Sequence, residues 1–488
     1  MSRPHEIVIV GGGAGGLELA TRLGRKYRRS GRVRVTLVDK KRTHIWKPKL
    51  HEIAAGSMDT GHHEVDYMAQ AHWNNFIFRL GALEAIDRAQ KTVELASYLD
   101  EDGRAVTPIQ HFSYDTLIIC IGSMSNDFGT RGVREHALKL ETQHDAKVFH
   151  SRMVNACIRA HNQIDAIHDR QLHVAIIGAG ATGVELAAEL HRTTREVVAF
   201  GLDRIDTQKD IKVTLIEAAD RILPALHPRL SNATEALLTR LGVQVLTSSK
   251  VTEVTATDVR LSDGQVIESE MVVWAAGVKA PEFLKDFGGL ETNRLNQLVV
   301  SNTLQSTRDE NIFALGDCAA CPCPDEDGGR GGVVPPRAQA AHQQASHMLS
   351  QINRRLSGAP LKPYRYRDFG SLVSLGKYST VGNLMGGIPE LIQALAELNV
   401  AGASVLRVRV DSAAKRTMVD ATSVQDLMHV HSEVTNLIAS QTGEIQLIED
   451  FVKRLTSSDG ARYEDLNNPE IRKWIDERGI LPTLRIRI

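Results

Sequence analysis

Short apolar runs that end in glycine recur along this chain of 488 residues. The first is IVIV at residues 7–10, which leads into a cluster of glycines and then a helix-favouring stretch from Leu17 to about Arg28. A second run, VRVTLVD, ends at Asp39. Apolar runs of about four to eight residues between turn residues are typical of buried strands, whereas apolar residues at every third or fourth position indicate helices. Residues 1–40 therefore predict a strand, a glycine turn, a helix and a second strand.

The same order of elements appears again 167 residues further along the chain. HVAIIGAG predicts a strand from Val174 and a glycine turn, the stretch after it predicts a helix, and IKVTLIE predicts a strand that ends in Glu217. Because 34 residues separate Glu217 from the last glycine of this turn, we expect a lengthened helix and loop before the strand. A repeat on this scale predicts two domains of one kind, the second inserted into the sequence of the first.

Elsewhere the pattern is less regular but still predicts elements. Before the repeat we expect irregular chain over 44–80, a β-meander over 81–95, a buried strand over 116–121 that ends at Gly122, and a helix over 142–168. Within the repeat we expect a helix over 227–242, three short β segments and a closing strand that ends at Gly277. After it we expect a strand within 311–319 and a helix from Pro336 to about Leu356. Pro336 fits the first turn of that helix. The last 90 or so residues predict one strand over 404–410 and three helices.

Composition narrows the class of protein. With 42% hydrophobic and 24% charged residues the chain can build cores, which argues against disorder. The formal net charge of −1 provides no basic surface, so we expect no nucleic-acid partner. Five cysteines in a long chain fit a reducing compartment, and no apolar run approaches the roughly 18 residues that span a membrane. We predict a cytoplasmic protein, or a peripheral protein on the cytoplasmic face of the inner membrane.

Each glycine cluster contains the pattern G-x-G-x-x-G. In this pattern the first glycine permits a tight turn, the second lets the backbone approach a pyrophosphate, and the third lets the helix pack close to the strand. The helix N-terminus then offers N–H groups and a positive dipole end to the phosphates. An acid at the end of the second strand, Asp39 or Glu217, can accept hydrogen bonds from ribose hydroxyls. The glycines are Gly11, Gly13 and Gly16 in the first cluster and Gly178, Gly180 and Gly183 in the second. We predict two dinucleotide sites; the alternative is a glycine-rich turn in another α/β domain.

Two dinucleotide sites in one chain indicate a resident FAD and a visiting nicotinamide nucleotide, between which a hydride passes. Glu217 favours NADH, since a carboxylate there would repel the 2′-phosphate of NADPH. A third strand-and-glycine element, ALGDCA, supplies Asp317, which we expect to bind a ribityl hydroxyl of the flavin; its alternative role is to cap the next turn.

These observations predict an α/β fold in three layers, with two Rossmann-like dinucleotide-binding domains and a C-terminal α+β appendage. The expected domains are an FAD-binding domain over 1–140 and 295–375, an NADH-binding domain over 141–294, a short membrane-proximal segment over 376–400 and an appendage of unknown role over 401–488.

The cysteine positions exclude one route for electrons. Flavin disulfide reductases carry a redox C-x4-C pair on the helix after the first glycine turn, and here no cysteine precedes Cys120. Electrons must therefore leave the flavin without a protein disulfide. Cys318, Cys321 and Cys323 are one ligand short of a structural zinc site, so we predict structural or incidental thiols and no metal.

Seven stretches of the chain resemble the type II NADH:quinone oxidoreductases, which are two-domain flavoproteins. The stretches are HIWKPKLHEIAAG, LIICIGSMSNDFG, IGAGATGVELAAEL, VVWAAGVKAP, FALGDCAACP, PPRAQAAHQQA and YRDFGSLVSLGKYSTVGNL. They occur in this order and the resemblance covers roughly residues 5 to 386. It implies oxidation of NADH, transfer of two electrons through FAD to a membrane quinone, and no proton pumping.

The resemblance also implies which residues form the site. The residues implied for FAD are Gly11, Gly13, Gly16, Asp39, Lys49, Gly122 and Asp317. The residues implied for NADH are Gly178, Gly180, Gly183, Glu185 and Glu217, and the matching motifs add Ala338 and Gly277 to the cofactor contacts. Glu185 and Lys377 resemble the family's charged pair near the flavin. Glu185 would shape nicotinamide docking or relay a proton towards the quinone; the alternative is a carboxylate that the helix dipole favours.

Residues 338–343, AQAAHQ, look like the family's quinone-site motif A-Q-x-A-x-Q. Independently of the resemblance, Gln339 and Gln343 are four residues apart, so we expect both amides on one helix face. Amide N–H groups can bind quinone carbonyl oxygens, and the helix N-terminus can stabilise charge on the reduced flavin. The alternative is a solvated polar face.

The chain departs from the family after GNLMGG, where relatives continue into amphipathic helices rich in aromatic and basic residues. Here IPELIQALAELNV carries two Glu and no Lys, Arg or aromatic residue, which predicts a poor interfacial anchor. Several alternatives stay open: peripheral membrane association, a homodimer, a soluble diaphorase or oxidase that reduces a soluble acceptor or oxygen, and a flavin-bound redox-sensing or partner-binding protein.

Overall fold

The computed structural model describes residues 3–61, 63–323, 332–375, 380–384, 407–411 and 416–420. The chain divides into two compact units: unit 1 consists of Met1–Lys49, Asp59–Asn126 and Gly277–Arg367, and unit 2 consists of Leu50–Met58, Asp127–Ala276 and Asp368–Ile488. The chain passes between the units after residues 49, 58, 126, 276 and 367. The expected domain boundaries at residues 140, 294 and 375 stay a prediction. The assignment of FAD and NADH to the units stays a prediction.

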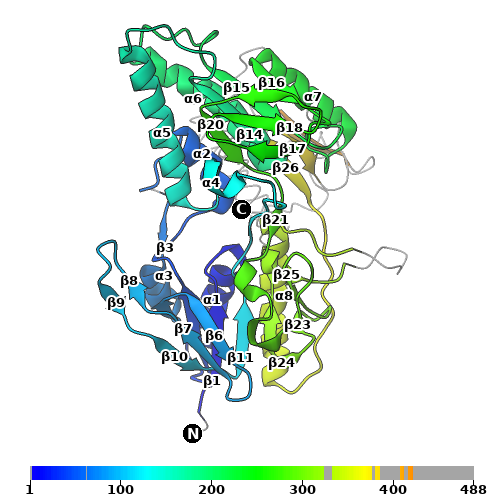
Figure 1. The fold of residues 1–488 in the computed structure, drawn as a ribbon. Coiled ribbons are helices and arrows are strands. Elements are labelled where there is room, and N and C mark those ends of the chain that lie inside the picture. Colours follow the sequence, from blue (N-terminus) through cyan, green and yellow to red (C-terminus); the bar gives the residue numbers. More distant parts are fainter. Residues whose placement is uncertain are drawn as a thin grey trace, which may run out of the picture. The chain divides into compact units, whose positions relative to one another are not determined.

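A six-stranded sheet forms the centre of unit 1 (Figure 1). Across the sheet its strands are β23 Gln305–Ser306, β24 Asp309–Ala314, β11 Thr116–Ile119, β1 His5–Val10, β2 Val33–Asp39 and β5 Ile77–Leu80. All neighbours pair in parallel except β23, which runs antiparallel to β24. Strands in parallel sheets are covered on both faces, which explains why β1 and β11 are apolar runs rather than alternating ones.

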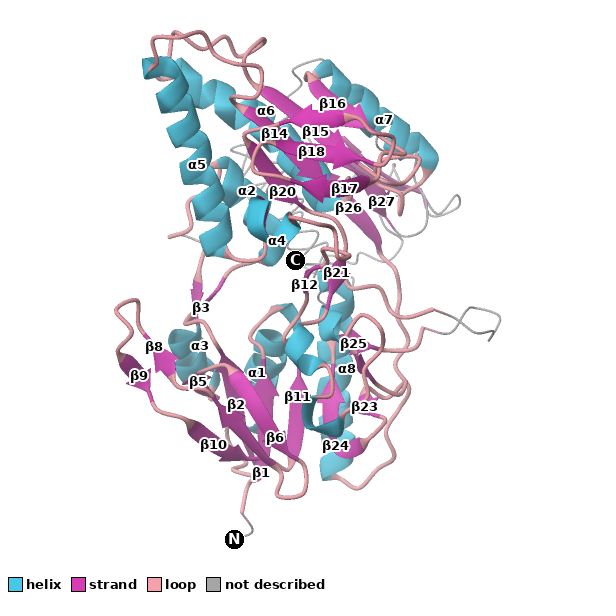
Figure 2. Ribbon diagram, viewed as in Figure 1, coloured by secondary structure: helices cyan, strands magenta, loops and turns pink. Residues whose placement is uncertain are grey.

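Helices cover the sheet of unit 1 and complete its core. They are α1 Ala14–Tyr27, α3 Tyr67–Asn74 and α8 Ala338–Leu356. Leu19 and Leu23 of α1 and Met348 of α8 belong to the same buried cluster as Ile7 and Ile9 of β1, so α1 links α8 to the sheet. A separate antiparallel sheet consists of β6 Leu83–Asp87, β7 Thr92–Leu95 and β10 Gln110–Ser113 (Figure 2).

Unit 2 repeats this plan with a parallel sheet of five strands. Across the sheet they are β13 Ala137–Lys139, β20 Met271–Trp274, β14 His173–Ile177, β15 Lys212–Ile216 and β16 Val243–Leu246. The helices are α2 Leu50–Ala55, α4 Val133–His136, α5 Gln143–Asn162, α6 Ala181–Ala199 and α7 Pro228–Arg240. The antiparallel sheet is β17 Val251–Val254, β18 Asp258–Leu261 and β19 Val266–Glu268. The predicted fold class, with its two domains of one kind, is therefore confirmed.

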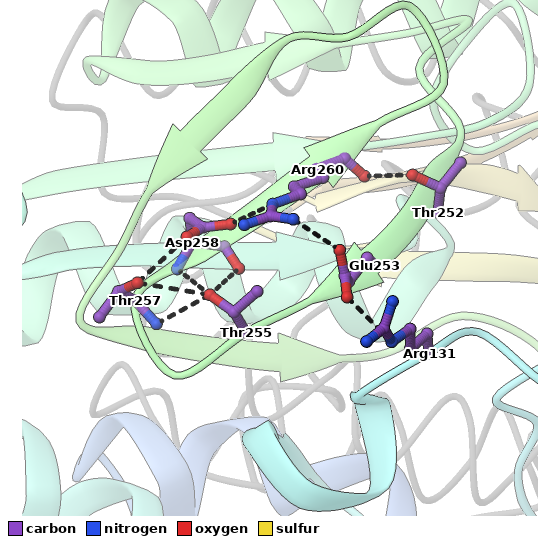
Figure 3. Close-up of polar contacts among 7 residues, drawn as sticks. All are labelled: Arg131, Thr252, Glu253, Thr255, Thr257, Asp258 and Arg260. Carbon is purple, nitrogen blue, oxygen red and sulfur yellow. Dashed lines mark hydrogen bonds and ion pairs between the residues drawn. The ribbon is translucent and has the colours of Figure 1, made fainter.

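Ion pairs connect the start of the Asp127–Ala276 segment of unit 2 to the antiparallel sheet of that unit (Figure 3). Arg131 Nε lies 3.1 Å from Glu253 Oε1, and Arg260 Nη1 donates to Glu253 Oε2 at 2.8 Å. Arg260 Nε also donates to Asp258 Oδ1 at 3.0 Å. The backbone follows the same path, since the Val254 N–H donates to the Arg131 carbonyl oxygen at 2.9 Å. These contacts attach the start of the Asp127–Ala276 segment to the antiparallel sheet of unit 2.

The remaining elements are short. Their strands pair as β3 Thr43–His44 with β4 Val65–Asp66, β8 Tyr98–Leu99 with β9 Ala105–Thr107, β12 Met124–Ser125 with β21 Val278–Lys279, β22 Leu298–Val299 with β25 Ala319–Ala320, β26 Gly370–Ser374 with β27 Thr380–Leu384, and β28 Arg407–Asp411 with β29 Arg416–Asp420. The 3-10 helices are η1 Lys47–Lys49, η2 Glu282–Leu284, η3 Phe287–Gly289 and η4 Gly316–Cys318.

The stretch 44–80, which we expected to be irregular, contains two helices. Asp66 caps α3, because its side chain accepts a hydrogen bond from the Ala69 N–H at 2.8 Å. Asn75 ends the same helix in a left-handed conformation with φ 58°. Both signals are present in the sequence, but α3, which they bound, is too short to show a clear apolar period.

Three predicted helix boundaries were wrong. The helix expected over 142–168 ends at Asn162, and α1 begins at Ala14 rather than at Leu17. Pro336 lies before α8 rather than in its first turn, since Arg337 is the N-cap residue and Ala338 is the first helical residue.

Most of the predicted appendage lies outside the described residues. The strand expected over 404–410 is described from Arg407 onwards, as β28. Lys377, the segment 388–400 and the three C-terminal helices that we expected are not described. Within the part of the chain that is described, no helix is both long and apolar enough to cross a membrane.

Candidate active site

The first glycine loop joins β1 to α1 and is shaped by contacts that only glycine permits. Gly11 has φ +104°, and a Cβ on it would lie 2.4 Å from the carbonyl oxygen of Cys120. A Cβ on Gly16 would lie 1.8 Å from the carbonyl oxygen of Gly11, so the first turn of α1 sits against its own loop. A Cβ on Gly13 would meet no atom within 4 Å, which leaves space at the helix start for a phosphate.

Asp39, at the end of β2, holds this loop with both carboxylate oxygens. Oδ2 accepts a hydrogen bond from the Gly12 N–H at 2.7 Å, and Oδ1 accepts one from the Lys41 N–H at 2.9 Å. Burial raises the pKa of Asp39, and these two donors oppose the rise. Each oxygen has a second lone pair, so the carboxylate can also accept a ribose hydroxyl.

Tyr67 of α3 covers the same loop, and the sequence did not single it out. Its buried hydroxyl donates to the Gly12 carbonyl oxygen at 2.7 Å. A Cβ on Gly12 would lie 2.5 Å from the Tyr67 ring, so this glycine is also required. A lone tyrosine in a stretch that we took as irregular carried no signal of this contact.

Asp317 is the centre of a second cluster in unit 1. Its Oδ2 accepts a hydrogen bond from Ser123 Oγ at 2.7 Å, and the Ser123 carbonyl oxygen accepts one from Lys47 Nζ at 2.7 Å. The preceding N–H, that of Gly316, donates to the buried side chain of Gln344 at 2.6 Å. Three segments that are distant in sequence therefore meet at Asp317. Gln344 was missed, although a glutamine in the apolar stripe of a helix is a usable signal.

Three other residues expected to contact FAD lie on the segments that form this cluster. Gly122, with φ +74°, directly precedes Ser123. Lys49 ends η1 and Ala338 begins α8, where it is half-buried. The structure places all three in unit 1 together with the first glycine loop. Their contacts with FAD stay predictions.

The second glycine loop, in unit 2, has the same internal contacts. Gly178 has φ +100°, and a Cβ on it would lie 2.7 Å from Ala276 Cα. A Cβ on Gly183 would lie 1.9 Å from the Gly178 carbonyl oxygen, and a Cβ on Gly180 would meet no atom within 4 Å. This loop also leaves space at its helix start.

Glu217 holds the second loop as Asp39 holds the first. It accepts hydrogen bonds from the Ala179 N–H at 2.8 Å and from the Ala219 N–H at 2.9 Å. Gly277, which we expected to close this domain, has φ +62° and is the first residue of the segment that returns to unit 1. Its carbonyl oxygen accepts a hydrogen bond from the Asn126 N–H at 3.2 Å, where the chain leaves that unit.

Glu185 of α6 is a buried carboxyl group inside unit 2. Oε1 accepts a hydrogen bond from the Ser374 N–H at 3.0 Å, and Oε2 lies 3.3 Å from His51 Nδ1. Burial raises the pKa of Glu185 to about 8, which the Ser374 N–H opposes and the nearby acids Glu52 and Glu189 reinforce. Glu185 therefore holds a proton at neutral pH. Neither His51 nor Ser374 was predicted, and Lys377, the expected partner, lies outside the described residues.

Gln339 and Gln343 lie one turn apart on α8, and both side chains meet the segment that follows the helix. Gln339 Oε1 accepts a hydrogen bond from the Tyr366 hydroxyl at 2.9 Å. Gln343 is 4% exposed, and its amide forms two bonds with the backbone of Arg367: Nε2 donates to the carbonyl oxygen at 2.8 Å and Oε1 accepts from the N–H at 3.1 Å. The two amides share one helix face, as predicted; a contact with quinone is untested.

Among the described helices, side-chain caps are present on some and absent from others, including the short α4, whose N-cap residue is Gly132. Side chains cap α3, α5 and α7. Within the described part of the chain, no side chain caps α1, α6 or α8, whose N-cap residues are Gly13, Gly180 and Arg337. The first N–H groups of a helix need partners, so these three ends can receive phosphates or other anions. The donors present fit two dinucleotides.

Three of the four cysteines of unit 1 are buried thiols, and the fourth, Cys323, is half-buried. Cys120 Sγ lies 3.1 Å from the Gly11 carbonyl oxygen, and burial raises its pKa well above the usual range. Burial also raises the pKa of Cys318 and of Cys321 to about 12. A thiol with so high a pKa reacts slowly, since the thiolate is the reactive form.

Two glycine loops with matching acids, on two parallel sheets, define an oxidoreductase that binds two dinucleotides. The family model described as "Pyridine nucleotide-disulphide oxidoreductase" matches residues 5–345. A type II NADH:quinone oxidoreductase from Haemophilus influenzae is 42% identical over 390 residues, which cover 78% of this chain and 86% of that protein. The relative NdhA from Mycobacterium tuberculosis, with the same description, is 30% identical over 78% of this chain and 79% of its own.

The solved structure of NDH2 from Plasmodium falciparum in complex with NADH has a TM-score of 0.72 against this chain, with 18% identity. The match covers 94% of this chain and 99% of that one, and it shows the shared fold. The chain belongs to the type II NADH:quinone oxidoreductases, within the pyridine nucleotide-disulphide oxidoreductase family.

Proposed function

We infer that this chain oxidises NADH through a bound FAD and passes two electrons to a quinone without pumping protons. Membership of the type II NADH:quinone oxidoreductases carries the inference. The two complete glycine loops agree with it, because the reaction needs a resident flavin and a visiting nucleotide. When bound, FAD supplies the redox chemistry, since it accepts a hydride and returns two electrons. The chain supplies binding, orientation and protons.

Unit 1 is proposed to hold FAD. In this proposal the loop at Gly11, Gly13 and Gly16 binds the pyrophosphate, Asp39 accepts a ribose hydroxyl, and Asp317 accepts a ribityl hydroxyl. The bond from Ser123 to Asp317 orients the carboxylate, which leaves its other oxygen to accept from the cofactor.

Unit 2 is proposed to hold NADH at the loop of Gly178, Gly180 and Gly183. The carboxylate of Glu217 would accept the 2′-hydroxyl of NADH and repel the 2′-phosphate of NADPH. Glu185 holds a proton at neutral pH because its pKa is raised to about 8. A carboxyl group that is protonated at pH 7 can supply one of the two protons that quinone reduction consumes.

The quinone is proposed to bind at α8. Gln339 would donate an N–H to a quinone carbonyl oxygen, while Gln343 holds the backbone of Arg367 in place. No cysteine precedes Cys120, so no disulfide on α1 takes part. The bound FAD would therefore supply electrons to the acceptor without a disulfide of α1 as an intermediate.

Steady-state oxidation of NADH with a short-chain ubiquinone or menaquinone analogue tests this function. We expect saturable quinone reduction with one quinone consumed for each NADH. Ferricyanide is the control acceptor, because it reports on the reduced flavin without a quinone site. Turnover with ferricyanide but not with either quinone analogue would reject the quinone reaction and retain the flavoenzyme. Turnover with oxygen alone would favour an NADH oxidase.

We also propose that the chain acts at the cytoplasmic face of a membrane as a peripheral protein, because long-tailed quinones dissolve in the bilayer. The expected result is sedimentation with membranes that high salt or mild detergent reverses. A chain that stays in the supernatant at low salt would contradict this placement and favour a soluble acceptor. A homodimer stays a prediction, which light scattering of the flavin-loaded protein tests.

A further inference from the structure

Tyr366 is joined to the side chain that is proposed to meet the quinone. Its hydroxyl donates to Gln339 Oε1 at 2.9 Å. The Tyr366 ring is half-buried and packs against the core of unit 1, so the hydroxyl is held in place by its own ring. All of these groups lie within unit 1.

The backbone around Tyr366 is fixed by two other glutamines of α8. Gln343 binds both the N–H and the carbonyl group of Arg367, the next residue. Gln351, two turns further along the helix, binds both backbone groups of Lys362, with the Lys362 N–H donating at 3.0 Å. Gln351 is fully buried, which makes these bonds strong anchors. The segment from Lys362 to Arg367 is therefore attached to α8 at both ends, with Tyr366 near one of them.

We propose that Tyr366 is a positioning residue for quinone binding, which sets the orientation of the Gln339 amide; this rests on the proposed quinone role of Gln339. A glutamine amide has an oxygen that only accepts and a nitrogen that only donates, on opposite sides of one carbon. When the Tyr366 hydroxyl donates to Oε1, the nitrogen is turned to the other side. A quinone carbonyl oxygen only accepts, so it needs the nitrogen and would be repelled by the oxygen.

The substitution Tyr366→Phe removes the hydroxyl and keeps the ring. We expect the quinone KM at saturating NADH, and the quinone Kd measured by calorimetric titration of the flavin-loaded protein, to rise about fivefold, which corresponds to one hydrogen bond. The rate at which NADH reduces the flavin under anaerobic conditions should be unchanged, because the amide has no part in that step.

Tyr364→Phe is the matched control. Tyr364 lies on the same segment, and its buried hydroxyl has no hydrogen-bond partner among the described residues. We expect the same quinone KM as in the wild type and a melting temperature that is equal or higher. A general loosening of the segment would instead raise KM in both variants, and equal effects would overturn the proposal.

A double-mutant cycle tests whether Tyr366 acts through Gln339. In the Gln339→Leu background, Tyr366→Phe should have no further effect on quinone KM, because there is no amide to orient. If the two substitutions raised the quinone KM independently, so that their factors multiplied in the double variant, Tyr366 would not act through Gln339. An unchanged quinone KM and Kd in Tyr366→Phe, with a wild type that reduces quinone, would overturn this inference alone. A wild type that is reduced by NADH but neither binds nor reduces the quinone would overturn the proposed function as well.

Discussion

The glycine loops of the two units share one design. Seven residues after the first glycine, each helix carries a glutamate, and each loop is held by an acid from the second strand of its sheet. Asp39 binds the N–H of Gly12, and Glu217 binds the N–H of Ala179, at the same position of the loop. In both loops the third glycine touches the carbonyl oxygen of the first. These common contacts are what a pyrophosphate-binding turn requires.

The loops differ in what lies over them. In unit 1, Tyr67 covers Gly12, and a Cβ on Gly15 would lie 2.6 Å from the side chain of Leu315 and 3.0 Å from the carbonyl oxygen of Ala341. In unit 2, the counterpart of Gly15 is the exposed Thr182. The helix start is therefore more enclosed at Gly15 than at Thr182, as the proposed assignment of a resident FAD to unit 1 and a visiting NADH to unit 2 requires.

The glutamates at the shared helix position also differ. Glu18 of unit 1 pairs with Arg22, at 2.9 Å, and with His342. Glu185 of unit 2 is buried, and its pKa is raised to about 8. The glutamate at this position pairs with one residue of its own helix and one of α8 in unit 1, and it is a buried, protonated acid in unit 2. The surroundings, rather than the residue type, decide the chemistry.

The strongest test of the comparison replaces the first glycine of each loop. Gly11→Ala and Gly178→Ala both place a Cβ at a left-handed φ and against backbone atoms, which costs about 1–2 kcal/mol before the clash is counted. We expect Gly11→Ala to be purified with little flavin and to lose NADH oxidation. Gly178→Ala should keep its flavin while the KM for NADH rises roughly tenfold or more, since 1.4 kcal/mol is tenfold in binding. The flavin-to-protein absorbance ratio and the rate of anaerobic flavin reduction measure the two outcomes.

Equal loss of flavin in both variants would contradict the assignment of FAD to unit 1. Loss of flavin from Gly178→Ala alone would instead assign FAD to unit 2 and NADH to unit 1.

The second test compares the two glutamates by pH. Folded Glu185 keeps its proton up to about pH 8, whereas the unfolded chain releases it near the ordinary value of 4.5. Unfolding between these values therefore releases a proton, and stability falls as the pH rises from 4.5 to 8. Glu185→Gln lacks this loss, so its stability relative to the wild type should increase by roughly 2–4 kcal/mol between pH 5 and pH 8. Thermal unfolding of the flavin-loaded proteins across this range provides the measurement.

Glu18→Gln is the matched control, and at pH 8 we expect it to lower stability relative to the wild type, whereas Glu185→Gln should raise it. It leaves Arg22 without its carboxylate partner, although the bond from Arg22 to Ser346 remains, and should lower stability by about 0–1 kcal/mol. A Glu185→Gln variant whose stability follows that of the wild type at every pH would show that Glu185 is ionised in the folded protein.

The features that repeat within the chain were predictable from sequence, and the contacts between distant segments were not. Glycine spacing and apolar runs indicated both sheets, both loops and both acids, because these depend on local geometry. Tyr67 meets Gly12 across 55 residues, Ser123 meets Asp317 across 194, and Ser374 meets Glu185 across 189. None of these contacts leaves a periodic signal, since each depends on how separate elements pack.

The third test exchanges the residues that cover the loops. Gly15→Thr should destabilise the contact between α1 and α8 by about 1–3 kcal/mol, because a Cβ there meets the backbone of Ala341 and the side chain of Leu315. Thr182→Gly should cost no more than about 1 kcal/mol, since the site is exposed and only helix propensity changes. Chemical denaturation of both variants measures these differences. Similar costs for the two changes would mean that the first loop is no more enclosed than the second.

The smallest expected effect concerns the side chain that covers the first loop. Tyr67→Phe keeps the ring, which stacks on Phe78 with centroids 5.1 Å apart, and removes the hydroxyl that donates to the Gly12 carbonyl oxygen. In unit 2 the equivalent carbonyl oxygen, that of Ala179, accepts from the Leu223 backbone N–H at 2.8 Å, so no side-chain change there is equivalent. Loss of a hydrogen bond to a buried carbonyl should weaken flavin binding by about 1 kcal/mol. Dilution experiments should then show that the variant releases its flavin faster than the wild type. The KM for NADH serves as the control and should not change. A variant that releases flavin at the wild-type rate would mean that the ring alone, and not the hydroxyl, keeps the first loop closed.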